Sequence, residues 1–264
     1  MSGRIVTLRF LLLLLSLLLP VAASAGSTSG GEPHFAAERI AALAKNVERT
    51  LAASGARVAI ISRVGRDPED LPAGIDFTHV AFAVYSRITT AEGKTLNGYA
   101  IYNLYQEKDH ADISTLAQDY PIDYFAPVFV LKSGVIIPKP AMQKRLLAVI
   151  MSDRYKHLHN PAYSVFANPL ENRYQNCTGF VLNVVQSAIY DSDDARVILA
   201  NNRKYFEPQK VDIGGMRLLL ARMFMDEVRT DDQHGPIRTT TFSSIARYME
   251  QYGLADRVTV VTDH

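Results

Sequence analysis

The single cysteine of the chain stands where a thiol could act as a nucleophile. It lies in the segment QNCTGF, residues 175–180, and apolar residues then recur at helical spacing as far as Tyr190. Asn176 is a favoured helix N-cap, which predicts Cys177 in the first turn of a helix. Unpaired backbone N–H groups and the helix dipole favour negative charge there, so we expect a lowered thiol pKa and an oxyanion-binding site. The side chain of Gln175 is a further candidate for binding the oxyanion.

A nucleophilic cysteine needs a base, and His79 is the histidine whose position suits that role best. It begins a predicted strand, Thr78–Ser86, directly after the acid-containing loop 65–76. Residues alternate between the faces of a strand, so His79, Ala81 and Ala83 are expected on one face. A third polar group is then required to fix the tautomer of the imidazole.

The following strand offers two candidates for that third group. Residues Gly98–Gln106 are predicted to pair antiparallel with the histidine strand. A hairpin centred on Ala91 places Asn103 opposite His79, whereas one centred between Glu92 and Gly93 places Gln106 there. The sequence does not fix this register. We favour Asn103 because its shorter amide orients a ring with less freedom, and keep Gln106 as the alternative.

Other interpretations of these residues stand beside the catalytic one. A lone cysteine in an amphipathic helix commonly packs as a small apolar side chain. The triplet Asn176-Cys177-Thr178 also matches the N-x-S/T acceptor pattern for a glycan. A metal site could use His157 and His159, but no third ligand has diagnostic spacing, so we expect neither a metal nor another cofactor.

The N-terminus has the three-part order of a secretory signal peptide. Residues 1–25 contain Arg4 and Arg9, an apolar run from Phe10 to Leu19, and the small-residue sequence Ala-Ser-Ala ending at Ala25. The apolar run is shorter than the roughly 20 residues of a membrane-spanning helix. We therefore expect cleavage after Ala25, a periplasmic location and no stable membrane anchor thereafter.

The composition limits the classes of partner. Removal of the signal peptide changes the formal net charge from +1 to −1, because two arginines and no acid are lost. A nearly neutral chain has no general attraction to nucleic acid, so none is expected as a partner. One cysteine forms no internal disulfide, and 48% hydrophobic residues suit a packed core.

The remaining patterns predict one α+β domain, an antiparallel sheet packed against helices. A flexible lead-in, 26–34, precedes a single domain over 35–264. Helices are expected around 40–51, from Pro140, from Cys177, over Met216–Val228 and over Ser244–Tyr252. Further strands are expected at 57–61, 128–131, 135–137 and 257–262, the middle two separated by Ser133-Gly134.

Two resemblances add to this. The chain resembles an uncharacterised family of exported bacterial proteins in five blocks, SRVGRD, FTHVAFAV, YNLYQ, YSVFANP and QNCTGFVLNV. A His-Val strand followed downstream by an Asn-Cys helix start is also similar to circularly permuted papain-like thiol hydrolases of the NlpC superclass. That resemblance implies a permuted papain-like (NlpC-like) core with added helices, Cys177 as nucleophile and His79 as base. The third position varies in that superclass among His, Asn, Gln and Glu, and several permuted members use an acid.

Together these observations predict an exported cysteine hydrolase that cleaves an amide or ester bond through a Cys-His-polar triad. The expected compartment makes a cell-wall peptide the first substrate class and an acyl group the second. The alternative is a non-catalytic periplasmic binding or structural protein that retains the fold.

Overall fold

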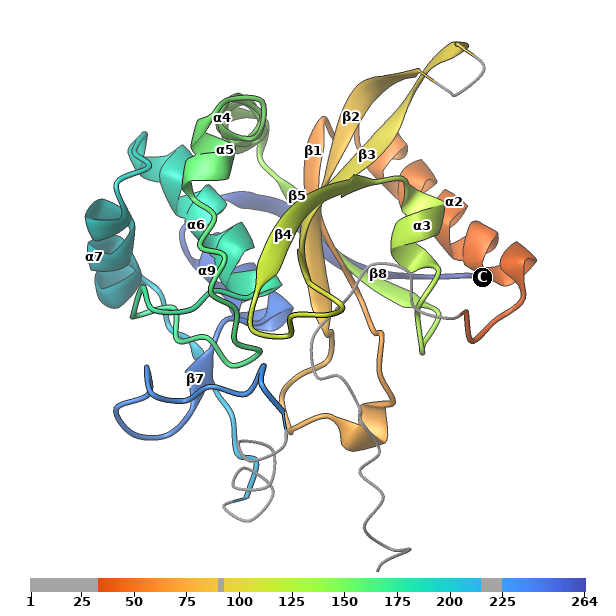
Figure 1. Cartoon of the computed structure of the whole chain (residues 1–264). Coiled ribbons are helices and arrows are strands. Elements are labelled where there is room, and N and C mark those ends of the chain that lie inside the picture. The colour runs from red at the N-terminus through yellow and green to blue at the C-terminus, as the bar shows by residue number, and fades with distance from the viewer. Residues whose placement is uncertain (1–32, 90–92, 215–224) are drawn as a thin grey trace, which may run out of the picture.

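The computed structural model describes residues 33–89, 93–214 and 225–264 (Figure 1). The predicted signal peptide and nearly all of the predicted lead-in lie outside the described residues. So does most of the helix expected over Met216–Val228, and its described part, 225–228, is not helical. Within the described ranges, no helix combines the length and the apolar character needed to cross a membrane.

A six-stranded antiparallel sheet forms the centre of the molecule, in the order β4-β3-β2-β1-β5-β8 (Figure 1). The α+β prediction is confirmed. The strands are β1 (Val58–Arg63), β2 (His79–Thr89), β3 (Thr95–Gln106), β4 (Ser114–Asp119), β5 (Lys132–Pro138) and β8 (Ala255–Thr262). A separate two-stranded ladder pairs β6 (Gln209–Lys210) with β7 (Arg238–Thr239).

Helices lie on both sides of the sheet (Figure 1). On one side are α2 (Ala37–Ala53) and α3 (Pro121–Phe125). On the other side are α4 (Pro140–Ile150), α5 (Arg154–His157), α6 (Cys177–Tyr190), α7 (Ala195–Tyr205) and α9 (Phe242–Gln251). A 3₁₀ turn, η2 (Pro68–Asp70), lies in the loop that leads into β2.

The period-two pattern of the central strands explains why the sheet is covered on both faces. Val80 and Phe82 of β2 pack in the core beneath α4, α6 and α9, whereas Ala81 and Ala83 pack in the core beneath α2 and α3. The central strands are therefore apolar on both faces, as the sequence shows, because each face buries its own set of side chains.

Local sequence signals place the start of α6 at Cys177, as predicted. The side chain of Asn176 accepts a hydrogen bond from the Gly179 backbone N–H at 2.8 Å and so caps the helix. The helix ends at Asp191, which adopts the left-handed conformation with φ 52°. The Asn176 cap and the continuous apolar spacing both indicate a helix that begins at Cys177, and for this reason the predicted start of α6 is confirmed.

Several elements differ from the expectation. The strand expected at 135–137 is confirmed as part of β5, whereas the strand expected at 128–131 is wrong, since only an isolated bridge at Val130 lies there. Strand β4 was not anticipated, because its polar edge residues show little apolar alternation. Helix α7 was also missed; it follows the acidic turn before it, and the side chain of Asp194 accepts from the Arg196 backbone N–H at 2.8 Å as its N-cap.

Gly134 allows β5 to pass close beneath α9. A Cβ at this position would lie 2.6 Å from both Phe242 Cε1 and Ser62 Oγ. We expect Gly134→Ala to lower the free energy of unfolding by about 1–3 kcal/mol through overpacking. Thermal unfolding followed by circular dichroism measures this. Gly98→Ala is the matched control, because its Cβ would meet only the flexible ends of Ile88 and Leu96; equal melting temperatures for the two variants would contradict the prediction.

Candidate active site

His79 and Asn103 form a hydrogen-bonded pair on the α3 side of the sheet. The distance from His79 Nε2 to Asn103 Oδ1 is 3.0 Å. Asn103 Nδ2 donates to Asp119 Oδ2 at 3.2 Å, which directs the amide oxygen toward the ring. An amide oxygen only accepts, so Nε2 carries the proton and Nδ1 carries the lone pair. Nδ1 is buried and has no hydrogen-bond partner among the described residues.

The register of β2 and β3 lies between the two that the sequence left open. Phe82 pairs with Tyr102 and Tyr85 with Tyr99, a register that continues to place Tyr105 opposite His79. The two rings stack, with centroids 4.9 Å apart and planes 4° apart. Asn103 reaches the imidazole diagonally along the same face, a distance that such neighbours span.

Gln106, the alternative third residue, has its side chain on the opposite face of β3. Its Nε2 donates to the carbonyl of Ala111 at 2.7 Å. The structure thus brings Asn103, and not Gln106, into a hydrogen bond with the imidazole.

Asp119 at the end of β4 completes this chain of polar groups, and the sequence did not reveal it. Its Oδ2 accepts from Asn103 Nδ2 at 3.2 Å and from the Tyr105 hydroxyl at 2.6 Å. The Asp119 carboxylate orients the Asn103 amide and so acts on His79 through Asn103.

Arg63 at the end of β1 is the second group that sequence reasoning missed. It pairs with His79 across the ladder and is buried, with its guanidinium 4.9 Å from the centroid of Tyr124 and 5.6 Å from that of Tyr105. Desolvation, and then the charge of Arg63, lower the pKa of His79 well below its usual value. The imidazole is therefore neutral near pH 7, the form that accepts a proton.

Cys177 is the first residue of α6, and only 5% of its surface is exposed. Burial, the largest cause, raises the pKa of the thiol. The backbone N–H groups of Val80, Thr178 and Cys177 itself, together with the charge of Arg63, act in the opposite direction. The predicted lowering of the thiol pKa is wrong, because desolvation exceeds the effect of the helix start and the nearby cation.

The thiol lies at the beginning of β2, next to the residue that follows the histidine. The backbone N–H of Val80 is close enough to the sulfur to lower its pKa, and Val80 and Cys177 share one core cluster. The imidazole extends from the other face of the strand, where it meets Tyr105 and Tyr124. No hydrogen bond joins the sulfur to the imidazole among the described residues.

Both ends of the Gln175 side-chain amide are engaged in hydrogen bonds with the backbone. Its Oε1 accepts from the Asn160 backbone N–H at 2.9 Å, and its Nε2 donates to the Leu158 carbonyl at 2.9 Å. The amide thereby ties the preceding loop to the helix start. The groups left to bind an oxyanion are the backbone N–H groups at the beginning of α6.

The buried side-chain amide of Asn176 is fully hydrogen-bonded and so cannot carry a glycan in the folded protein. Its Nδ2 donates to the Val165 carbonyl at 2.9 Å and to Thr239 Oγ1 at 3.1 Å, while its Oδ1 caps the helix. A buried amide with all these contacts has no free N–H for a sugar. The glycan interpretation of this triplet is therefore incompatible with the fold.

A cavity of about 210 Å³ is lined in part by Cys177 and not by His79. Cys177 and Thr178 of α6 line it together with Thr78, the residue before His79. The loop that leads into β2 forms one wall, and the segments 163–166 and 239–241 form the other. Most of its lining is apolar, contributed by Leu71, Phe77, Val165, Phe166 and Val228.

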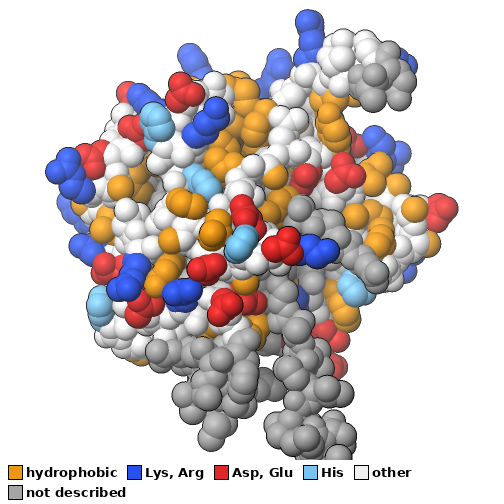
Figure 2. Space-filling view, viewed as in Figure 1, with side chains coloured by type: hydrophobic (Ala, Val, Ile, Leu, Met, Phe, Trp, Pro, Cys, Tyr) orange, Lys and Arg blue, Asp and Glu red, His pale blue; other side chains and the backbone are white. Residues whose placement is uncertain are grey.

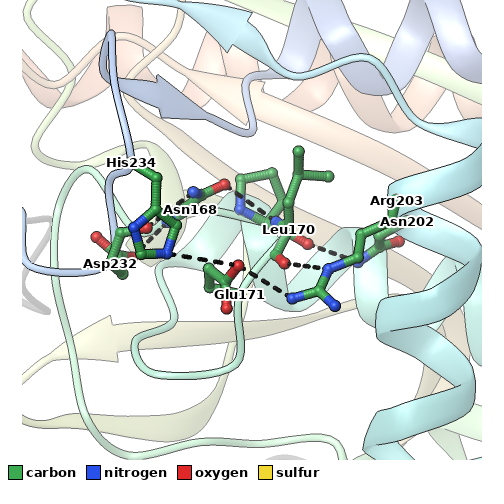
Figure 3. Close-up of polar contacts among 8 residues, drawn as sticks. Asn168, Leu170, Glu171, Asn202, Arg203, Asp232 and His234 are labelled. Atoms are coloured by element: carbon green, nitrogen blue, oxygen red, sulfur yellow. Dashed lines mark hydrogen bonds and ion pairs between the residues drawn. The ribbon is translucent and has the colours of Figure 1, made fainter.

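A polar network fixes the chain behind that second wall (Figure 3). The Asn168 backbone N–H donates to Asp232 Oδ2 at 2.8 Å, and Asn168 Nδ2 donates to the Asp232 carbonyl at 2.9 Å. Arg203 of α7 donates through Nε to the Leu170 carbonyl at 2.8 Å and through a terminal nitrogen to Glu171 Oε1 at 3.0 Å. These bonds connect the segment after Phe166 to α7 and to the 232–234 loop, so the cavity wall has a rigid support.

The two neighbouring histidines considered for metal binding have separate partners. His157 Nδ1 lies 2.9 Å from Asp193 Oδ2, and His159 Nε2 lies 3.0 Å from Ser114 Oγ. Over the part of the chain that the structure describes, no three His, Cys, Asp or Glu side chains group as metal ligands.

Comparison with known proteins places the chain in a family without assigning it an activity. No curated protein and no solved structure matches the chain. Residues 50–249 match a family described as "Uncharacterized protein conserved in bacteria (DUF2145)". That range contains both Cys177 and His79 and covers most of the sequence. The chain belongs to this family of uncharacterised bacterial proteins.

Proposed function

We propose that this protein is a cysteine hydrolase of permuted papain-like design that cleaves an amide or ester bond. One observation carries the proposal: the buried Nδ1 of His79 has no hydrogen-bond partner among the described residues, and the backbone N–H of the next residue, Val80, lies near the Cys177 sulfur at the start of α6. Unsatisfied buried polar atoms are rare in folded proteins, and an unpaired imidazole lone pair suits a general base. The cavity that ends at the sulfur supplies a place for a substrate.

Cys177 would attack as a thiol that loses its proton during the reaction. Its proton passes to His79 Nδ1 while the sulfur bonds to the substrate carbonyl carbon. The backbone N–H groups at the start of α6 bind the resulting oxyanion. The C–N or C–O bond then breaks, and the leaving group takes the proton from Nδ1. Water, deprotonated by Nδ1, cleaves the thioester, releases the acid and restores the thiol.

Asn103 and Asp119 are positioning residues in this scheme. The Asn103 amide holds the tautomer with Nε2 protonated, and the Asp119 carboxylate holds the amide. Hydrogen bonds between catalytic partners are often long in ligand-free enzymes and tighten when substrate binds. The proposal therefore requires that substrate bring the sulfur within hydrogen-bonding distance of Nδ1.

The proposed location is the periplasm, with the signal peptide cleaved after Ala25. This proposal rests on the signal-peptide pattern of residues 1–25. The proposed substrates are cell-wall peptides or acyl groups, because a periplasmic hydrolase meets both.

The direct test is a covalent intermediate on the thiol. The mature protein is mixed with isolated cell-wall sacculi and, separately, with activated acyl esters, and its intact mass is measured after acid quenching. We expect an acyl adduct that peptide mapping assigns to Cys177, and no adduct on the Cys177→Ala variant. Turnover without an adduct, or an adduct that survives in that variant, would refute a cysteine nucleophile.

The pH dependence follows from the direction of the His79 shift. The base must be neutral to accept a proton, and its pKa lies well below the usual 6.5. The acid limb of kcat/KM is therefore expected below pH 6.5, with a flat profile from about pH 6.5 to pH 8. Initial rates across this range measure it, with circular dichroism at each pH to exclude unfolding. An acid limb centred near 6.5 or higher would contradict the neutral imidazole.

A second candidate function is a non-catalytic binding or structural protein with the same fold. The raised thiol pKa and the lack of a sulfur–imidazole hydrogen bond among the described residues favour it. It predicts ligand binding in the cavity without turnover and without a covalent adduct.

A further inference from the structure

We propose that the cavity beside Cys177 binds an uncharged apolar group of the substrate, of the size of a phenyl ring or a hexanoyl chain. This inference rests on the proposed function and names its substrate class, an apolar acyl group rather than an anionic cell-wall peptide. Three properties of the cavity support it: its size and lining, the balance of charge in its lining, and a buried hydroxyl that has no partner among the described residues.

The size and lining of the cavity fit a compact apolar group. Its volume is about 210 Å³, larger than the roughly 150 Å³ of an engineered apolar cavity that binds benzene. Phe77 and Val228 are buried in its wall, and Val165, Phe166 and Leu71 add partly buried apolar surface. Filling such a site removes ligand surface from water, and the gain increases with each buried methylene.

The charges around the cavity disfavour an anionic ligand. Arg66 is the basic side chain in the lining, and it interacts electrostatically with the carboxylates of Glu227 and Asp70. Among the described residues of the lining, the charge of Arg66 is therefore balanced by that of Asp70, and the buried Arg63, whose charge acts on the thiol, is not part of the lining. The carboxylates of a cell-wall stem peptide would find no unbalanced cation among these lining residues. Acidic and basic side chains are also interspersed over the face shown in Figure 2, where no basic region stands out.

Thr240 supplies a polar group at the cavity wall. Its Oγ1 is buried and has no hydrogen-bond partner among the described residues, while its carbonyl accepts from Thr178 Oγ1 at 2.7 Å. The residue thus lies against the first turn of the cysteine helix. A buried hydroxyl without a partner is costly, and a substrate oxygen entering between Thr240 and Cys177 would satisfy it. An apolar acyl group with one carbonyl has this combination.

The first test is a chain-length series. Hydrolysis of 4-nitrophenyl acetate, butyrate and hexanoate is compared with that of the 4-nitrophenyl monoester of glutaric acid, which ends in a carboxylate. We expect kcat/KM to rise about fourfold per methylene up to hexanoate, and the glutarate ester to react at least about tenfold more slowly than the hexanoate ester. Equal rates along the series, or a preference for glutarate, would overturn the inference and leave the hydrolase proposal intact.

Variants then locate the effect in the cavity. Val165→Phe is expected to abolish the preference for hexanoate over acetate, because the larger ring occupies the space. Val197→Phe, the same substitution at an exposed position on α7 outside the cavity, is the matched control. Leu71→Phe provides a second filling variant should Val165→Phe fail to fold. A hexanoate preference that survives in the folded filling variants would refute the assignment to this cavity.

A binding measurement separates this inference from the proposed chemistry. The Cys177→Ser variant is titrated with hexanamide and with glutaramic acid by isothermal calorimetry. Binding of hexanamide alone, lost in the double variant with Val165→Phe, supports the apolar pocket even if no ester is ever hydrolysed. The absence of hexanamide binding would overturn the pocket assignment whatever the kinetics show.

Discussion

Replacing Cys177 with alanine is expected to lower kcat/KM for acyl-ester hydrolysis by about 10⁴-fold or more, to the background rate. Loss of the nucleophile in hydrolases with a comparable triad removes nearly all catalysis, because the remaining groups act only through it. The thiol is small and almost wholly buried, so alanine should leave the fold intact. Steady-state kinetics on activated esters, with the melting temperature measured in parallel, tests this expectation.

Ser187→Ala is the matched control for that experiment. Ser187 lies on the same helix, is fully buried, and its Oγ has no hydrogen-bond partner among the described residues. The substitution likewise exchanges a small hydrogen-bonding group for a methyl group. Its kcat/KM should equal that of the wild type. Hydrolysis that persists in Cys177→Ala would exclude the thiol mechanism, whereas equal losses in both variants would point to damage to α6.

Substitution of His79 with glutamine is expected to lower kcat/KM by about 10³-fold without unfolding the protein. General base catalysis contributes roughly 10²–10⁴-fold, and an amide cannot accept the thiol proton. Glutamine preserves a donor that can reach Asn103 Oδ1. The acid limb of the pH profile should disappear along with the rate, a change that a structural role alone would not cause.

Two further variants test whether the loss of activity is specific to His79 and its hydrogen-bond partner. Asn103→Ala should lower kcat and move the acid limb to lower pH, because the imidazole loses the acceptor that holds its tautomer and that raises the His79 pKa. His159→Gln is the control, since His159 is bonded to Ser114 and lies outside the thiol cavity. A wild-type rate in His79→Gln, or an equal loss in His159→Gln, would remove His79 from the proposed mechanism.

The raised thiol pKa changes how reactivity should be interpreted. A thiolate at rest would favour rapid alkylation at neutral pH, but burial keeps Cys177 protonated. In the proposed mechanism the thiolate forms only as His79 takes the proton, so slow alkylation of the free protein is compatible with fast catalysis. Covalent capture by a substrate is therefore the more informative observation.

The sequence by itself determined the elements whose signals are local. The Asn176 cap and the apolar spacing behind it located α6 to the residue, and alternation along β2 assigned His79 to the face that it occupies. These features depend on contacts between residues close together in the chain, which composition and period express directly. The α+β class followed from the same patterns.

Only the tertiary structure decided how those residues are combined. Asp119 of β4 bonds the Asn103 amide, and Arg63 of β1 pairs with His79, through strand pairings that no local pattern specifies. The register that sets Tyr105 opposite His79 arises from packing on both faces of the sheet. The thiol pKa was mispredicted for the same reason, because the desolvation that raises it comes from residues distant in sequence. The sequence predicts local secondary structure directly, whereas the electrostatic environment of the thiol depends on how the folded core packs around it.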